Sequence, residues 1–178
     1  CGNKAIVHIL NENTVWNTLI ISPPGFGKTT LLKDIIKKIS NGIPEFNFKG
    51  VTCGVVDERG ELSATYKGIS QNDLGIRTDV IDNIPKALGM KMLIRSMSPK
   101  VIIADEIGKK EDVDAIEYAV TSGVKGIFTA HGSDLEQIEH NPILNQLIIN
   151  GYIEKVLAMD KQRNVHLLYE KQSKRKVS

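Results

Sequence analysis

A glycine-rich octet at residues 22–29, SPPGFGKT, constrains the fold of this chain more than any other stretch. The apolar residues 18–21 precede it and predict a buried strand. Residues 30–39 follow, with apolar side chains on one helical face. A strand, a tight glycine-rich loop and a Gly-Lys-Thr that begins a helix are typical of a phosphate-binding loop. We therefore expect an anion site at the start of this helix.

Each residue type in the octet has a physical role there. Glycines let backbone N–H groups turn toward an anion, and the helix N-terminus adds partial positive charge. Lys28 can reach the β- and γ-phosphates of a nucleotide, and Thr29 can ligate Mg²⁺. Ser22 stands where such loops usually have their first glycine. The predicted nucleotide contacts are Pro24, Gly25, Phe26, Gly27, Lys28, Thr29 and Thr30.

Length and composition limit the class of protein. With 178 residues, the chain is long enough for one domain with a substantial core, and we expect residues 1–178 to form a single P-loop domain. A net charge of +2 gives no electrostatic reason to expect nucleic acid as a partner. No apolar run approaches the roughly 18 residues of a membrane helix. Cys1 and Cys53 make no disulfide framework, which suits a reducing cytosol. Because the chain starts at Cys1 rather than at methionine, we expect a fragment that lacks an N-terminal domain.

Residues 101–106, VIIADE, form the second decisive stretch. An apolar strand that ends in two carboxylates is what a P-loop enzyme places opposite its phosphate loop. The first acid, Asp105, is expected to hold the Mg²⁺ shell, partly through water, and the second, Glu106, to orient and polarise an attacking water. The combination with the octet predicts an ATPase.

Further segments complete the expected sheet. Residues 51–56 predict a strand that ends in the charged cluster Asp57-Glu58-Arg59-Gly60-Glu61, at the edge where open α/β sheets place ligands. Residues 126–131 predict another strand, on which Thr129 and His131 point the same way and can sense a γ-phosphate. Residues 67–84 lack periodicity and are expected to form a long functional loop. The remaining expectations are strands at 5–10 and 15–21, helices at 85–97, 111–121 and 134–150 (interrupted at Pro142), and a hairpin of 155–159 with 165–169.

The order of these elements predicts an α/β P-loop NTPase, RecA/AAA+-like. Its central sheet is mostly parallel and flanked by helices, with a C-terminal β-hairpin. The expected activity is Mg²⁺-dependent hydrolysis of ATP to ADP. Two alternatives stay open: a P-loop kinase for a small molecule, and a nucleotide-gated binding module. Sustained ATP turnover with no added phosphate acceptor would distinguish an ATPase from both alternatives.

Three arginines are candidates to neutralise a γ-phosphate in transfer. Arg59 follows a strand end and suits a role within its own subunit, whereas Arg77, in the long loop, suits contact with a neighbour's nucleotide. Arg95 ends the helix before the acidic strand. The competing interpretation is that all three pair with nearby acids such as Glu61, Asp79 or Asp82.

Several uncommon segments together resemble the stage III sporulation protein AA family, namely residues 17–24, 56–61, 75–80, 94–99 and 129–132. The resemblance runs from about residue 15 to residue 160. In that family Ser-Pro-Pro begins the loop, which accounts for Ser22. The family is in turn similar to type II and type IV secretion ATPases, which are hexameric motors on the cytoplasmic side of a membrane channel.

The resemblance implies a cytoplasmic sporulation ATPase, peripheral to the membrane through partners. It would form a homo-hexamer and energise a channel complex between mother cell and forespore. It implies that Lys28 and Thr29 are Walker A residues, that Asp105 and Glu106 are Walker B residues, and that Thr129 with His131 form a histidine box. The cluster that begins at Asp57 resembles the aspartate box. Secretion ATPases usually have glycine where Asp105 stands, and we expect no helical lid like that of many AAA+ proteins.

Overall fold

A seven-stranded sheet forms the centre of the computed structural model, which describes residues 2–67 and 69–172. The strand order is β5-β4-β6-β7-β3-β8-β9, and every neighbouring pair is parallel except β8 with β9. This confirms the predicted mostly parallel sheet and the C-terminal hairpin. The strands are β3 (Thr18–Ser22), β4 (Cys53–Asp57), β5 (Thr78–Asp82), β6 (Val101–Ala104), β7 (Lys125–His131), β8 (Lys155–Met159) and β9 (Val165–Glu170).

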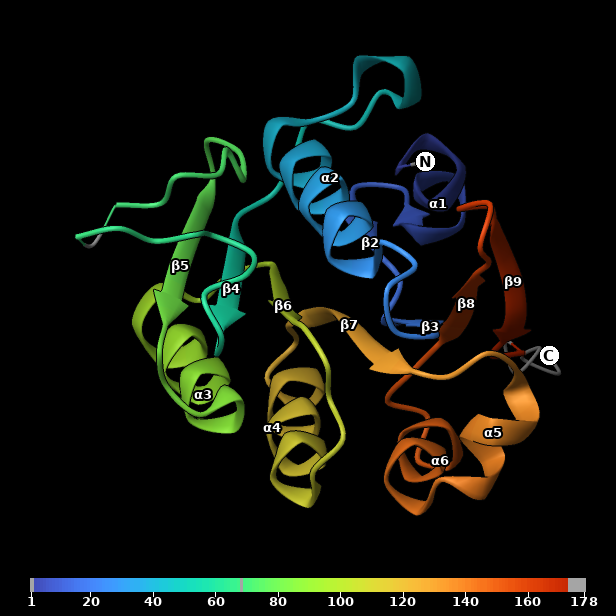
Figure 1. The fold of residues 1–178 in the computed structure, drawn as a ribbon. Coiled ribbons are helices and arrows are strands. Elements are labelled where there is room, and N and C mark those ends of the chain that lie inside the picture. The colour runs from blue at the N-terminus through green and yellow to red at the C-terminus, as the bar shows by residue number, and fades with distance from the viewer. Residues whose placement is uncertain (1, 68, 173–178) are drawn as a thin grey trace, which may run out of the picture.

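Helices cover both faces of the sheet (Figure 1). On one face, α1 and α2 enclose a core that includes Ile6, Ile35 and Ile103. On the other face, α3, α4 and α6 enclose a core that includes Met90, Ile116 and Leu147. Strands β3, β4, β6 and β8 are buried along their whole length, as parallel strands covered on both faces require. The helices are α1 (Gly2–Ile9), α2 (Lys28–Asn41), η1 (Pro44–Phe46, a 3₁₀ helix), α3 (Lys86–Met97), α4 (Lys110–Thr121), α5 (Leu135–His140) and α6 (Pro142–Ile149).

The parallel arrangement brings the polar strand ends to one edge of the sheet. Ser22 at the end of β3 is in register with His131 at the end of β7. Ala104, the last residue of β6, is in register with Phe128 on β7 and with Val56 on β4. The phosphate loop, the acidic pair and the charged cluster after β4 therefore leave the sheet side by side.

The first expected strand, residues 5–10, is wrong: this segment belongs to helix α1. Ala5, Ile6 and Ile9 are buried, whereas Val7 is 53% exposed. Those spacings place the buried residues on one helical face, where they meet α2. A short apolar run alone does not distinguish a strand from a helix, and here packing on α2 decides.

The structure also refines other segments. Residues 15–21 are split, because β2 (Thr14–Val15) pairs with β1 (Leu10–Asn11) as a separate small sheet and only β3 joins the main one. The segment 67–84, expected as a loop, contains the outer strand β5. Residues 134–150 form two helices that meet before Pro142, as expected. Cys53 is a buried free thiol, and Cys1 lies outside the described residues. None of the helices in the described ranges is long and apolar enough to span a bilayer.

Candidate nucleotide site

The phosphate loop connects β3 to α2 and opens a pocket above the helix N-terminus. Gly25 and Gly27 have φ angles of 80° and 90°, in the left-handed region that favours glycine. Gly27 is the N-cap of α2, so the unpaired N–H groups of the first helical turn face the loop. A pocket of about 360 Å³, the phosphate pocket, lies there. It is lined by Pro23, Pro24, Gly25, Gly27, Lys28, Thr29, Glu61, Glu106 and His131. This is the geometry of an anion site.

Two of the residues predicted to contact a nucleotide, Phe26 and Thr30, have side chains outside this pocket. Phe26 lines a neighbouring pocket and packs on the core beneath α2, and Thr30 is exposed on the outside of that helix. Neither side chain lines the pocket above the helix N-terminus.

Lys28 is held in this pocket with little access to solvent. The residue is 7% exposed, and this burial lowers the pKa of its ammonium. The carboxylates of Asp105 and Glu106 act in the opposite direction and raise it. The Lys28 ammonium donates to Nδ1 of His131 over 3.4 Å. The lysine is thus a desolvated cation that faces the pocket, and its electrostatic attraction for a bound anion is stronger there than in water.

Thr29 and Asp105 lie where a divalent cation would need them. Thr29 Oγ1 donates to Asp105 Oδ2 over 3.4 Å, across from the phosphate loop to the end of β6. Adjacent oxygens of an octahedral Mg²⁺ shell are about 2.9 Å apart, as follows from Mg–O distances near 2.0–2.1 Å. A hydroxyl and a carboxylate at this spacing fit such a shell with a small adjustment. The donor set, all oxygen, is also the one that Mg²⁺ prefers.

Glu106 pairs with Arg59 and lies close to His131 at the rim of the pocket. Arg59 Nη1 donates to Glu106 Oε2 over 2.7 Å, and His131 Nε2 lies 3.6 Å from Glu106 Oε1. The backbone of Glu106 has a φ of 51°, which is uncommon for a residue with a Cβ. Backbone strain of this kind clusters at functional sites.

Thr129 contacts both acids, Asp105 and Glu106, through its hydroxyl. It is fully buried on β7, and its hydroxyl donates to Asp105 Oδ1. The same hydroxyl accepts the backbone N–H of Glu106 over 2.8 Å. His131, two residues on, instead faces the phosphate pocket. The two side chains of the expected γ-phosphate sensor therefore have different surroundings: Thr129 contacts the acids, and His131 lines the pocket.

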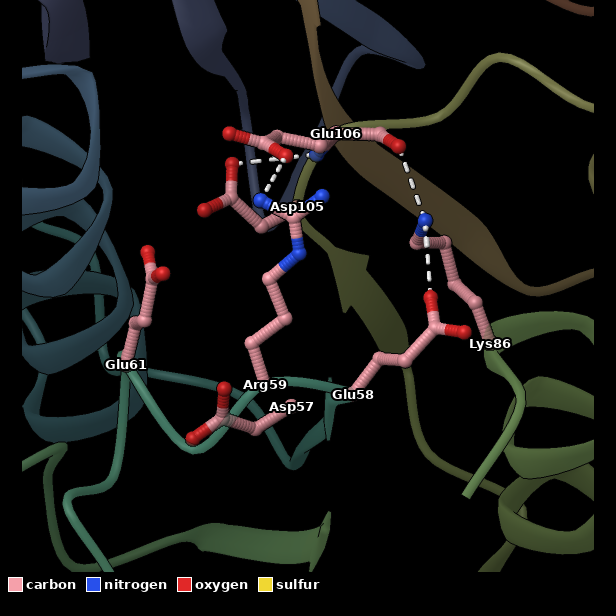
Figure 2. A pocket seen from close by; sticks show the side chains of 7 residues that line it. All are labelled: Asp57, Glu58, Arg59, Glu61, Lys86, Asp105 and Glu106. Atoms are coloured by element: carbon pink, nitrogen blue, oxygen red, sulfur yellow. Dashed lines mark hydrogen bonds and ion pairs between the residues drawn. The ribbon is translucent and has the colours of Figure 1, made fainter. Parts of the chain in front are cut away.

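The residues of the charged cluster at the end of β4 make different contacts (Figure 2). Asp57 is buried and accepts from the Leu62 and Ser63 amides and from Ser63 Oγ, which orders the turn that follows. Glu58 pairs with Lys86 over 3.1 Å. Arg59 pairs with Glu106. Only Arg59, among the three arginines singled out from the sequence, joins the nucleotide site within the described chain.

The other two arginines lie away from the pocket. Arg77 donates through its backbone N–H to Ser40 Oγ and through Nη1 to Ser40 O, each over 2.8 Å, near the C-terminal end of α2. That is the opposite end of the helix from the phosphate loop. Arg95 lies over the ring of Tyr118, 5.9 Å from its centroid.

Sequence reasoning missed Lys86 and Arg163. Lys86 is buried at the start of α3 and donates to the backbone carbonyl of Glu106. No local sequence pattern predicts this contact. Arg163 lies in the β8–β9 turn, with a φ of 61°. A Cβ placed on Gly27 would be 3.3 Å from Arg163 Nε, so the guanidinium lies against the phosphate loop. The turn signal at residues 160–164 predicted the hairpin but not its position.

Taken together, the strand order, the flanking helices and the glycine-rich loop define the fold of P-loop secretion ATPases. Solved structures with the same fold include the Legionella pneumophila ATPase DotB (TM-score 0.61, 18% identity, 92% of this chain and 47% of that one). The pilus retraction motor PilT follows (TM-score 0.60, 15% identity, 89% and 48%). The VirB11 ATPase of the Brucella suis type IV secretion system is also similar (TM-score 0.53, 17% identity, 85% and 46%).

The chain belongs to the family described as "Sporulation stage III, protein AA", whose profile matches residues 1–176. It is 42% identical to the stage III sporulation protein AA of Bacillus subtilis over 171 residues, which are 94% of this chain and 55% of that protein. It is also 33% identical over 148 residues to the uncharacterized protein ycf45 of Cyanidium caldarium, with 82% and 42% covered. The chain thus spans about half the length of these relatives.

Proposed function

We propose that this chain binds ATP with Mg²⁺ and hydrolyses it to ADP. The single observation that carries the proposal is that two separate segments, the phosphate loop with Lys28 and Thr29 and the end of β6 with Asp105 and Glu106, meet at one site. Thr29 and Asp105 are 3.4 Å apart, and Lys28 and Glu106 both line the pocket above the α2 N-terminus. The ATPase fold of the structural neighbours supports this assignment.

Each group has a distinct task in the proposed reaction. The first-turn N–H groups of α2 and the Lys28 ammonium bind the β- and γ-phosphates. Thr29 and Asp105 would hold Mg²⁺, which neutralises phosphate charge when bound. Glu106 accepts hydrogen bonds from the attacking water and polarises it. His131, within 3.4 Å of Lys28 Nζ and 3.6 Å of Glu106 Oε1, is placed to report the presence of a γ-phosphate to both.

Arg59 has a second role in this scheme. Its guanidinium pairs with the Glu106 carboxylate over 2.7 Å. Its side chain is 65% exposed and long enough to turn toward an incoming γ-phosphate. Such a turn would release Glu106 for water and place the arginine on the developing charge, where arginines contribute roughly 10³–10⁵ in rate.

Two substitutions test binding and chemistry separately. Lys28→Ala removes the main protein cation at the phosphates, so calorimetry should show most MgATP binding lost. Glu106→Gln keeps the shape of the side chain but not its basicity, so binding should persist while turnover falls by roughly 10²–10⁴. Lys33→Ala, on the same helix but outside the lining of the pocket, is the matched control.

Turnover is measured without a phosphate acceptor, which separates an ATPase from a kinase or a binding module. Equal ATP affinity in wild type and Lys28→Ala would overturn the phosphate-loop assignment. If Glu106→Gln loses MgATP binding while its residual rate of ATP turnover is unchanged, Glu106 has a structural role.

We further propose that the complete protein works as a homo-hexamer in the cytoplasm, held at the membrane by channel proteins of a sporulation complex and without nucleic acid. In this assembly Arg77 would reach the nucleotide of a neighbouring subunit. Mixing Lys28→Ala with Arg77→Ala subunits should restore activity through intact composite sites. If sedimentation shows mixed rings and activity stays at the level of either variant alone, the role of Arg77 in a neighbour's site is refuted.

A further inference from the structure

Lys86 is a buried lysine that the proposed reaction leaves without a role. It is the first residue of α3 and is 8% exposed. Its ammonium lies in a small pocket between the ends of β4 and β6, lined by Asp57, Glu58, Arg59, Glu61, Lys86, Asp105 and Glu106 (Figure 2). Burying an ammonium is unfavourable unless partners compensate it, so its contacts are informative.

The ammonium joins two strand ends. Lys86 Nζ donates to the backbone carbonyl of Glu106 over 2.8 Å and pairs with Glu58 Oε2 over 3.1 Å. Figure 2 shows both interactions on the side of Glu106 away from Arg59. Lys86 is not part of the lining of the phosphate pocket, so it does not face the phosphates.

The contacted carbonyl belongs to a residue whose backbone needs support. Glu106 has a φ of 51°, and a residue with a Cβ keeps such a conformation only where its surroundings hold it. Its N–H donates to Thr129 Oγ1 and to Asp105 Oδ1, over 2.8 and 3.1 Å. Its carbonyl is held by Lys86. The peptide units on both sides of the Glu106 Cα are therefore fixed by side chains from other elements.

We propose that Lys86 is a positioning residue that fixes the Glu106 backbone and thereby aims its carboxylate into the phosphate pocket. The proposal rests on the proposed function, since it assigns Glu106 to the attacking water. Without the ammonium, the Glu106 peptide relaxes to negative φ, and the carboxylate leaves the position where it meets Arg59 and His131. Displacements of about 1 Å at a reacting group lower rates by up to about 100-fold.

The first experiment compares Lys86→Met, Lys86→Arg and a matched control. Lys110→Met is the control, because Lys110 also begins a helix, α4, but is exposed. Lys86→Met should lower kcat about 10- to 100-fold while the Kd for MgATP stays within about threefold. Lys86→Arg keeps a donor for the carbonyl and for Glu58, so it should recover most of the rate. Lys110→Met should match wild type.

A second experiment reads the backbone directly and needs no turnover. Crystal structures of wild type and Lys86→Met should show a positive φ at residue 106 in the first and a negative φ in the second. If Lys86→Met does not fold, Glu58→Gln replaces it, because it weakens the ion pair without removing the ammonium and should lower kcat less.

The outcomes separate the two proposals. A wild type that binds no MgATP, or does not hydrolyse it, refutes the proposed function, while the φ of residue 106 still decides whether Lys86 holds the backbone. An unchanged φ in Lys86→Met overturns the positioning role. So does an unchanged kcat, or a loss confined to MgATP affinity.

Discussion

Replacing Thr129 with valine tests whether its hydroxyl holds the two acids in place. The hydroxyl is fully buried, donates to the Asp105 carboxylate and accepts from the Glu106 amide. A hydrogen bond to a charged group contributes about 1.5–3 kcal/mol, and one between neutral groups about 1 kcal/mol. The Glu106 amide keeps Asp105 Oδ1 as a second acceptor at 3.1 Å, so it is not left without a partner. We therefore expect Thr129→Val to lower the free energy of unfolding by about 2–3 kcal/mol.

The neighbouring strand β3 offers a matched control. Thr18 is equally buried, and its hydroxyl donates over 2.8 Å to a single neutral acceptor, Trp16 O. Thr18→Val should cost only about 0.5–1.5 kcal/mol. Urea unfolding followed by circular dichroism measures both values, provided that the two variants have the same m-value. If Thr129→Val is no more destabilising than Thr18→Val, the Thr129 hydroxyl does not hold the two acids in place.

Three further predictions concern pH, thiol chemistry and packing. Burial lowers the pKa of Lys28, and bound phosphates should raise that pKa again. MgADP binding should therefore take up protons. Its affinity should fall as the pH rises through the lowered pKa of the free protein. Calorimetry in alkaline buffers of different ionisation enthalpy measures this, and an affinity that does not change with pH would contradict it. Burial raises the pKa of Cys53 to about 12, so in a Cys1→Ser background its thiol should react with an aromatic disulfide reagent only as fast as the chain unfolds. Fast labelling of the folded protein would count against this. A Cβ on Gly89 would lie 2.6 Å from Val56 Cγ1, so Gly89→Ala should destabilise by about 1–3 kcal/mol despite alanine's better helix propensity; a raised Tm would refute the close approach.

The centre of the site was predictable because its signals are local in sequence. The octet at residues 22–29 contains its own turn and helix start, and Asp105 and Glu106 directly follow an apolar strand. A parallel sheet then brings strand ends to one edge without further information. The sequence alone therefore predicts that Lys28, Thr29 and both acids lie close together.

The parts that could not be predicted depend on contacts between distant segments. Lys86 meets a backbone carbonyl 20 residues away, and a carbonyl has no sequence signature. Strand β5 is an outer strand with two aspartates and no fully buried residue, so it lacks the apolar alternation that marks a strand. Residues 5–10 did contain a helical signal, since Ala5, Ile6 and Ile9 share one face, but β-branched residues favour a strand.

The strand order has a consequence for how the molecule opens. Strands β3, β6 and β7, which lead to the phosphate loop, the acids and His131, each have hydrogen-bonded neighbours on both sides. Strands β5 and β9 are the outer ones of the described sheet, with a partner on one side. Backbone amides at such margins exchange with solvent through small local openings, whereas central ones wait for global unfolding. The β8–β9 turn, which carries Arg163, can therefore open locally while the groups that would hold Mg²⁺ and phosphate keep their relative positions.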